Sequence, residues 1–259
     1  RHCNQVDARS AKGLYEIIYA MKKRRRWPCG RLQNKAPERI LFQPFPQWRK
    51  FAGGIYKNNA RSEIMLTVPE EFLLLTLQDE NGGFVDIHHE KQRAGFVGAA
   101  IMELGLQGRI DSDLDRVWVV DATPTGDPAL DVVLTALASP KFNGEAALVL
   151  SQLIALSGQV RSEALKELCA KNILVETEGR ILWFLKTRRY PVIDGKEVRE
   201  VKLRLLDVLL RDGLPGPRDV CLMSLAETCG IIAQIVPQSE LIIARERISK
   251  FAKMELIGQ

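Results

Sequence analysis

The chain has 259 residues, 46% of them hydrophobic and 27% charged, which is typical of a globular protein whose core needs no disulfides. Its net charge of +5 is uneven, because residues 1–64 hold 15 Lys and Arg against 4 Asp and Glu, whereas residues 65–259 hold 22 against 28. An odd number of scattered cysteines and only three histidines argue against a disulfide framework and a structural zinc site (Cys3, Cys29, Cys169, Cys221, Cys229; His2, His88, His89). A cytosolic protein is predicted, because no apolar run is long enough to span a bilayer and the start lacks the apolar region of a signal peptide.

Residues 1–64 are interpreted as a basic, poorly ordered N-terminal extension. They contain the run MKKRRRWPCGR (residues 21–31) and show little sustained periodicity. One alternative is a basic arm that binds nucleic acid, anionic lipid or a protein partner. Another is that translation starts at Met65 or Met21, since position 1 is arginine. In each case we expect residues 65–259 to form the folded domain.

A helix is predicted to begin at Thr67. Thr67 and Glu70 have the spacing of a capping box, and Pro69 suits the first turn, where a missing N–H costs nothing. The apolar residues from Phe72 to Leu77 predict a heavily buried helix that ends at residues 79–83. A second buried helix is predicted over Ala94–Gln107, where small residues would let another element approach closely (Gly95, Gly98, Ala99, Ala100).

The remaining pattern predicts a mainly α fold, a single helical domain with short β-hairpins. The first hairpin pairs two short strands, and the second, wing-like and hydrophobic, pairs residues 173–175 with 181–185 around a turn at 176–180. The longest apolar run, residues 220–236, is too short to span a bilayer and contains Glu227. The other predicted elements are strands Arg109–Asp111 and Arg116–Asp121, and helices Pro128–Leu137, Gly144–Leu156, Val160–Lys171, Lys196–Arg211, Pro217–Val236 and Ser239–Met254.

Motifs for catalysis are missing from the sequence. It has no glycine-rich nucleotide loop and no nucleophile elbow, and His88 and His89 stand together on a predicted loop. The acidic cluster of Asp111, Asp113 and Asp115 lacks the glycine and distal glutamate of a calcium loop, so a solvated turn is favoured over a cation site. We therefore expect neither a metal nor a cofactor, and no enzyme activity.

The second hairpin carries a binding signal. Ile181, Leu182, Trp183 and Phe184 precede three cations, Lys186, Arg188 and Arg189. Because alternate side chains of a strand face opposite ways, one apolar pair would face outward, and apolar side chains beside cations suit a bilayer interface. The alternative, which spacing alone favours, is that neighbouring helices bury both pairs.

Four motifs in order resemble the Golgi phosphoprotein 3 family. They are LTVPEEFLLLTLQDENGG, GFVGAAIMELGLQGRI, PTGD and ELCAKNILVETEGRILWF, and the similarity covers about residues 65–255. The segment before PTGD is short, and no long insertion precedes Val117. In both respects the sequence looks more like the family's bacterial members than its eukaryotic ones. The resemblance implies a mostly helical domain that binds membranes peripherally.

The resemblance also implies partners. Eukaryotic members recognise phosphatidylinositol 4-phosphate on Golgi membranes and bind the cytosolic tails of glycosyltransferases, and their hydrophobic hairpin enters the bilayer and mediates self-association. For this chain it therefore implies an anionic phospholipid surface, cytosolic tails of membrane proteins and a second copy as partners. The implied location is cytoplasmic and peripherally membrane-associated, at the Golgi in a eukaryote.

The family's lipid pocket transfers to this sequence in part. Its tryptophan falls at His88, and two of its arginines fall at Val97 and Gly158, while a third is kept as Arg161. Losing two arginines would cost roughly two to four decades of affinity, so a general preference for anionic lipid is expected. The expected headgroup-binding residues are His88, Arg161, Lys186, Arg188 and Arg189, and the expected membrane-inserting residues are Ile181, Leu182, Trp183 and Phe184.

Two other function classes were weighed against a membrane adaptor. A helix-and-wing nucleic-acid-binding protein would use Lys22–Arg26 to contact phosphates, but the acidic balance of residues 65–259 counts against it. An enzyme of unknown type is disfavoured by the missing motifs.

Overall fold

The fold is taken from a computed structural model, which describes residues 65–77, 84–85, 87–112, 116–142, 146–182, 185–193, 195–211 and 215–257. For residues 146–147, 178–182, 185–189 and 252–257 it describes the backbone alone. The described residues from Leu66 onward belong to one compact unit. The N-terminal extension expected over residues 1–64 lies outside the described residues, so the domain boundary at 65 stays a prediction.

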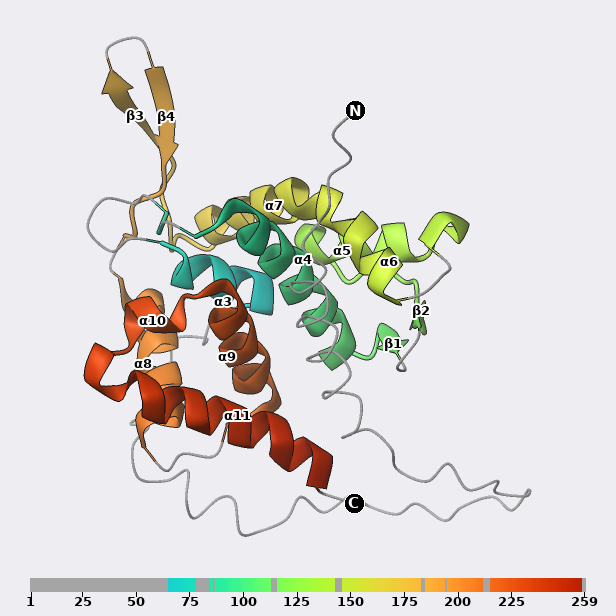
Figure 1. Ribbon diagram of the computed structural model, residues 1–259. Helices are drawn as coiled ribbons and strands as arrows, with labels where there is room; N and C mark the ends of the chain where they lie inside the picture. Colours follow the sequence, from blue (N-terminus) through green and yellow to red (C-terminus); the bar gives the residue numbers. More distant parts are fainter. Residues whose placement is uncertain are drawn as a thin grey trace, which may run out of the picture. The chain divides into compact units, whose positions relative to one another are not determined.

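The described part of the chain confirms a mainly α-helical fold, with two antiparallel two-stranded sheets (Figure 1). No helix among these residues is both long and apolar enough to cross a bilayer. The elements are α3 Val68–Leu75, α4 His89–Leu106, β1 Ile110–Ser112, β2 Val117–Val119, α5 Pro128–Leu137, α6 Ala146–Leu153, α7 Ser157–Ala170, β3 Thr177–Leu182, β4 Leu185–Arg189, α8 Lys196–Leu210, α9 Pro217–Cys229, α10 Ile232–Ile235 and α11 Leu241–Ile257, with short 3-10 helices at Pro140–Phe142, Ile154–Leu156 and Gln238–Glu240.

Helix α4 starts five residues before its predicted start. His88 is its N-cap, outside the helix, and His89 is its first helical residue, so the predicted loop holds for His88 and was wrong for His89. Where local chemistry is strong the prediction succeeds: α5 has the predicted bounds, because Asp127 accepts hydrogen bonds from the N–H groups of Ala129 and Leu130 and Pro128 opens the helix.

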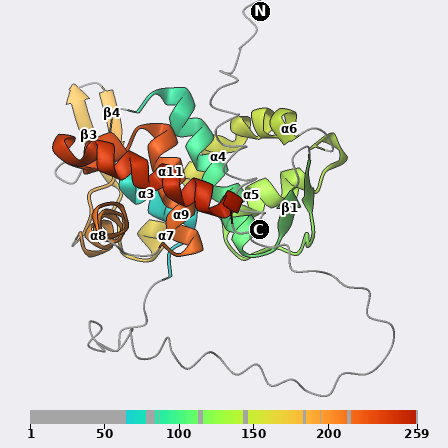
Figure 2. The same ribbon diagram turned by 60° about the horizontal axis from the view of Figure 1, so that its bottom comes forward.

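The single helix predicted over residues 217–236 is two helices. α9 ends at Cys229, and Gly230 follows with a φ of 78°, in the left-handed region that ends a helix. α10 then runs over four residues before α11, which lies against α8 and α9 (Figure 1 and Figure 2).

The second hairpin exists, but its turn was predicted in the wrong place. β3 includes the polar residues 177–180, which were assigned to the turn, and pairs them with residues 186–189. The ladder continues to the pair Leu182–Leu185 with an irregularity at Ile181, so two residues connect the strands. Residues 177–180 thus belong to a strand, in a hairpin that extends away from the helices, and not to a turn (Figure 1). Leu174 instead forms an isolated bridge with Val192 at the hairpin's base.

Helix α3 is the buried centre of the fold. All eight of its residues are buried, and it contacts α4, α7, α8 and α9. The predicted capping box forms: the Glu70 carboxylate accepts from the Thr67 N–H at 2.7 Å. The Val68 N–H donates to the Glu103 carboxylate of α4 at 2.8 Å, and Pro69 has no N–H to satisfy. Carboxylates from within the interior thus accept from the N–H groups of Thr67 and Val68 at the start of α3.

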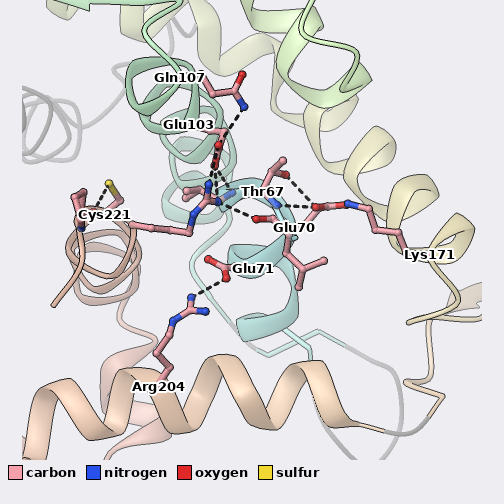
Figure 3. Close-up of polar contacts among 12 residues, drawn as sticks. Thr67, Glu70, Glu71, Glu103, Gln107, Lys171, Arg204 and Cys221 are labelled. Atoms are coloured by element: carbon pink, nitrogen blue, oxygen red, sulfur yellow. Dashed lines mark hydrogen bonds and ion pairs between the residues drawn. The ribbon is translucent and has the colours of Figure 1, made fainter. Parts of the chain in front are cut away.

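Three carboxylates around α3 are paired with cations from other helices (Figure 3). Glu70 accepts from Lys171, which follows α7, at 2.5 Å, and Glu71 accepts from Arg204 of α8 at 2.7 Å. Glu103 receives both terminal nitrogens of Arg218 from α9, at 2.7 and 3.0 Å. These ion pairs connect α3 and α4 to the rest of the helices.

Gly95 allows α4 to lie close to α3 and α9, as its small size predicted. A Cβ atom at this position would lie on the Phe72 ring of α3 and 2.9 Å from the Cys229 sulfur of α9. Gly105, on the same helix, has nothing within 4 Å of such an atom. The two glycines of one helix therefore differ in what they allow.

Gly95→Ala should lower the free energy of unfolding by about 1–2 kcal/mol, because overpacking outweighs the gain in helix propensity. The matched control Gly105→Ala should leave stability unchanged or raise it by about 0.5–1 kcal/mol. Urea unfolding followed by circular dichroism measures both. Equal effects of the two substitutions would show that α4 does not approach α3 as closely as described.

Glu71 should give the fold a specific pH dependence. Burial raises the pKa of its carboxyl above the ordinary value of 4.5, against the opposing effect of Arg204, and its Oε2 atom is buried without a hydrogen-bond partner. The folded chain therefore binds this proton more tightly than the unfolded chain, and the stability that results is lost as the pH rises through the raised pKa.

Consequently, the stability of Glu71→Gln relative to the native chain should increase as the pH is raised from below 4.5 towards neutrality. Urea unfolding of both proteins across that range measures the difference. A relative stability that falls with rising pH would mean that pairing with Arg204 dominates over burial.

Candidate functional site

A pocket of about 290 Å³ lies between the start of α4 and the start of α7. Its volume is at the lower end of the range for ligand pockets, which suits a small polar group. The lining combines arginine, histidine, hydroxyl and amide groups with one buried aromatic ring. The lining residues are His89, Gln92, Arg93, Phe96, Ala155, Ser157, Gly158 and Arg161.

Arg161 is the distinctive group in this pocket. Its guanidinium stacks over the Phe84 ring, 4.0 Å from the ring centroid, and its Nε is buried without a hydrogen-bond partner. Burial lowers the pKa of the guanidinium below its ordinary value. No carboxylate among the described residues pairs with it. A half-buried charge without a partner costs stability, so an anion entering the pocket would find a favourable position.

The pocket is adjacent to the base of the second hairpin. Phe84, under the Arg161 guanidinium, has its ring centroid 6.3 Å from that of Tyr190, and Tyr190 directly follows β4. A ligand held by Arg161 would therefore lie near the segment from which β3 and β4 extend.

The structure separates the residues that the resemblance grouped. His88 is exposed and does not line the pocket, whereas its neighbour His89 does. Val97 is fully buried in the core, so the position of one family arginine lies away from solvent here. Gly158 and Arg161 both line the pocket, and a Cβ atom at Gly158 would meet nothing within 4 Å.

The hairpin residues are described in part. Ile181 and Leu182 end β3, and Lys186, Arg188 and Arg189 lie on β4, where the backbone alone is described. Trp183 and Phe184, the two residues between the strands, lie outside the described residues. The roles expected for these seven residues therefore remain predictions, although the chain positions of Trp183 and Phe184 are those of a hairpin tip.

Sequence reasoning missed Arg93 and its neighbours. His89, Gln92, Arg93 and Phe96 are spaced i, i+3, i+4 and i+7, which places them on one face of a helix. That signal was available, but the helix was predicted to start only at Ala94, so the spacing went unnoticed.

The comparisons with known proteins agree with the resemblance. The family model described as Golgi phosphoprotein 3 (GPP34) matches residues 68–259. Vacuolar protein sorting-associated protein 74 of Eremothecium gossypii is 29% identical over 178 residues, which cover 60% of this chain and 52% of that protein. A VPS74-like protein of Dictyostelium discoideum is 28% identical over 188 residues, covering 65% of this chain and 69% of that protein.

The chain thus spans about half the length of the Eremothecium relative. Both relatives are eukaryotic, so these comparisons give no support to the interpretation that the chain looks like the family's bacterial members.

Arg161→Met should raise the free energy of unfolding by about 0.5–1 kcal/mol, because it removes a half-buried charge that no described carboxylate pairs with and keeps an apolar contact with Phe84. Arg218→Met is the matched control: it leaves Glu103 buried without its cation and should lower stability by about 3 kcal/mol. Urea unfolding at neutral pH measures both. Similar losses for the two variants would mean that Arg161 is a structural residue.

Proposed function

The chain belongs to the Golgi phosphoprotein 3 family, and on that premise we propose that it is an adaptor that attaches peripherally to membranes by recognising anionic phospholipid headgroups. By resemblance the headgroup is that of phosphatidylinositol 4-phosphate. The observation that carries the proposal is Arg161, whose half-buried guanidinium lines a pocket without an acidic partner among the described residues. A phosphate group would supply that missing charge through charge-assisted hydrogen bonds.

The second hairpin supports the same proposal. Its connecting residues, Trp183 and Phe184, are aromatic, and Lys186, Arg188 and Arg189 follow on β4. Tryptophan at headgroup depth with cations facing anionic lipid is the usual chemistry of a membrane interface. Because Phe84 and Tyr190 connect the pocket to the hairpin's base, one membrane patch would contact both.

The protein partners follow from the family and remain part of the proposal. The name of the Eremothecium relative refers to vacuolar protein sorting, which supports a role in membrane traffic. We propose cytosolic tails of membrane proteins as cargo, self-association through the hairpin, and a Golgi location in a eukaryotic cell. The role assigns no catalytic step to the chain.

The second hypothesis is binding of nucleic acid through Lys22–Arg26, which lie outside the described residues. The order α7, β3, β4 is a helix followed by a wing, as such proteins require. Against it stands the balance of residues 65–259, which hold 22 basic and 28 acidic residues, so that duplex-binding charge would have to come from residues 1–64.

Co-sedimentation with liposomes tests the proposal. The full chain should bind liposomes that contain phosphatidylserine or phosphatidylinositol 4-phosphate and should not bind neutral phosphatidylcholine. Trp183→Ala should weaken binding about tenfold, because an interfacial aromatic side chain is lost. Trp118→Ala, which removes a partly exposed tryptophan from β2, is the matched control and should bind like the native chain.

The liposome assay and a nucleic-acid-binding assay, both repeated on residues 65–259, separate the two hypotheses. Lipid binding should survive removal of residues 1–64, whereas nucleic-acid binding through Lys22–Arg26 should disappear. Failure of the full chain to bind any charged liposome would contradict the membrane proposal.

A further inference from the structure

Arg93 is a second arginine that lines the same pocket as Arg161. It comes from α4, whereas Arg161 comes from α7, so the two cations belong to different walls of the pocket. Arg93 is about one-third exposed and therefore accessible to a ligand, at 33% of its side-chain surface. None of the family positions transferred by resemblance includes it.

The contacts of Arg93 hold the guanidinium in place without using it fully. Its Nε donates to the Ser157 hydroxyl at 3.3 Å, and one terminal nitrogen donates to the Ile154 carbonyl at 3.4 Å. The other terminal nitrogen pairs with Glu90 at 3.2 Å. Charge-assisted hydrogen bonds to an anion are usually 2.7–2.9 Å long. An entering anion could therefore replace these long contacts with shorter ones.

We propose that Arg93 and Arg161 bind one phosphomonoester group between them, and that Glu90 competes with that group for Arg93. The inference rests on the proposed function in taking this pocket as the headgroup site, and adds Arg93 as a second binding residue and Glu90 as the competitor. The sequence predicted a general preference for anionic lipid, because two family arginines are missing. Arg93 supplies a further cation, so we expect a preference for phosphomonoester headgroups in particular.

Charge and shape both favour a phosphomonoester over a phosphodiester. Near neutral pH a phosphomonoester carries close to two negative charges, because its second pKa is about 6. It also presents three terminal oxygens as hydrogen-bond acceptors. Two guanidinium groups match that charge, and each presents a planar fork of donors. A phosphodiester has one negative charge and fewer free oxygens, so it would leave one guanidinium without an equal partner.

Glu90 is the residue that would set the affinity. Its carboxylate lies 3.2 Å from Arg93 and 3.7 Å from the His89 imidazole, at the entrance of α4, and is about half exposed. A fixed carboxylate this close repels an incoming phosphate and occupies one of its donors. Removing the carboxylate therefore frees Arg93 without changing the walls of the pocket.

The test uses the full chain, calorimetric titration with glycerol 3-phosphate, and liposomes of equal surface charge that contain either phosphatidylinositol 4-phosphate or phosphatidylserine. Arg93→Gln should weaken phosphomonoester binding about tenfold, and Glu90→Gln should strengthen it about threefold. Lys91→Gln is the matched control, because Lys91 is an exposed cation on the same helix outside the pocket. It should change binding less than twofold.

The two variants do not depend on one another. If Arg93→Gln loses its helical circular dichroism, Glu90→Gln still decides the matter, since a carboxylate in the first turn is not part of the core. Weaker binding by Glu90→Gln, or equal effects of Arg93→Gln and Lys91→Gln, would overturn the inference.

The two probes, glycerol 3-phosphate and liposomes, distinguish this inference from the membrane proposal. Glycerol 3-phosphate binding with the expected variant effects, but no liposome binding, would support the two-arginine site and contradict the membrane role. Liposome binding that is equal for both lipids and unchanged by Arg93→Gln would support the membrane role and contradict the two-arginine site. Failure of both probes would overturn both.

Discussion

The fold depends on satisfying charge around a helix that has no solvent-exposed face. The carboxylates at the amino end of α3 cannot reach bulk water, so Glu70 and Glu71 are paired with cations carried by later parts of the chain. Glu103 of α4 accepts from the first N–H group of α3 and from Arg218. Since breaking a buried pair costs several kcal/mol, these contacts fix how the helices sit around α3. The walls of the pocket, α4 and α7, contact α3 and also contact each other directly.

Arginines in this chain therefore have two different roles that local sequence does not distinguish. Arg204 and Arg218 are paired with carboxylates, whereas Arg161 lies over an aromatic ring and has no acidic partner in the part of the chain that the structure describes. A chain selected for stability alone would gain by replacing Arg161 with an apolar residue. Keeping a charged residue at this position is understandable if a ligand supplies the negative charge that pairs with Arg161.

Much of the fold could be predicted from sequence, and the failures have identifiable physical causes. Asp127 and Pro128 begin α5 through local hydrogen bonding, which sequence reveals directly. The break at Gly230 depends on a backbone angle that a continuous apolar pattern hides. In the site, Arg161 was found through a family resemblance, whereas Arg93 was missed because the helix that carries it was predicted to start one residue later, at Ala94. That Arg93 meets Ser157, 64 residues away, is a tertiary contact that leaves no local pattern.

The ion pairs around α3 also constrain how the chain can fold as it is made. Glu71 and Arg204 are 133 residues apart, and Glu103 and Arg218 are 115 apart. At a synthesis rate of about 5–20 residues per second, roughly 7–27 seconds pass between the appearance of Glu71 and that of its partner. During that interval a nascent α3 holds apolar side chains and carboxylates whose shelter does not yet exist. Until α8 and α9 have been synthesised, this segment exposes apolar side chains that favour aggregation.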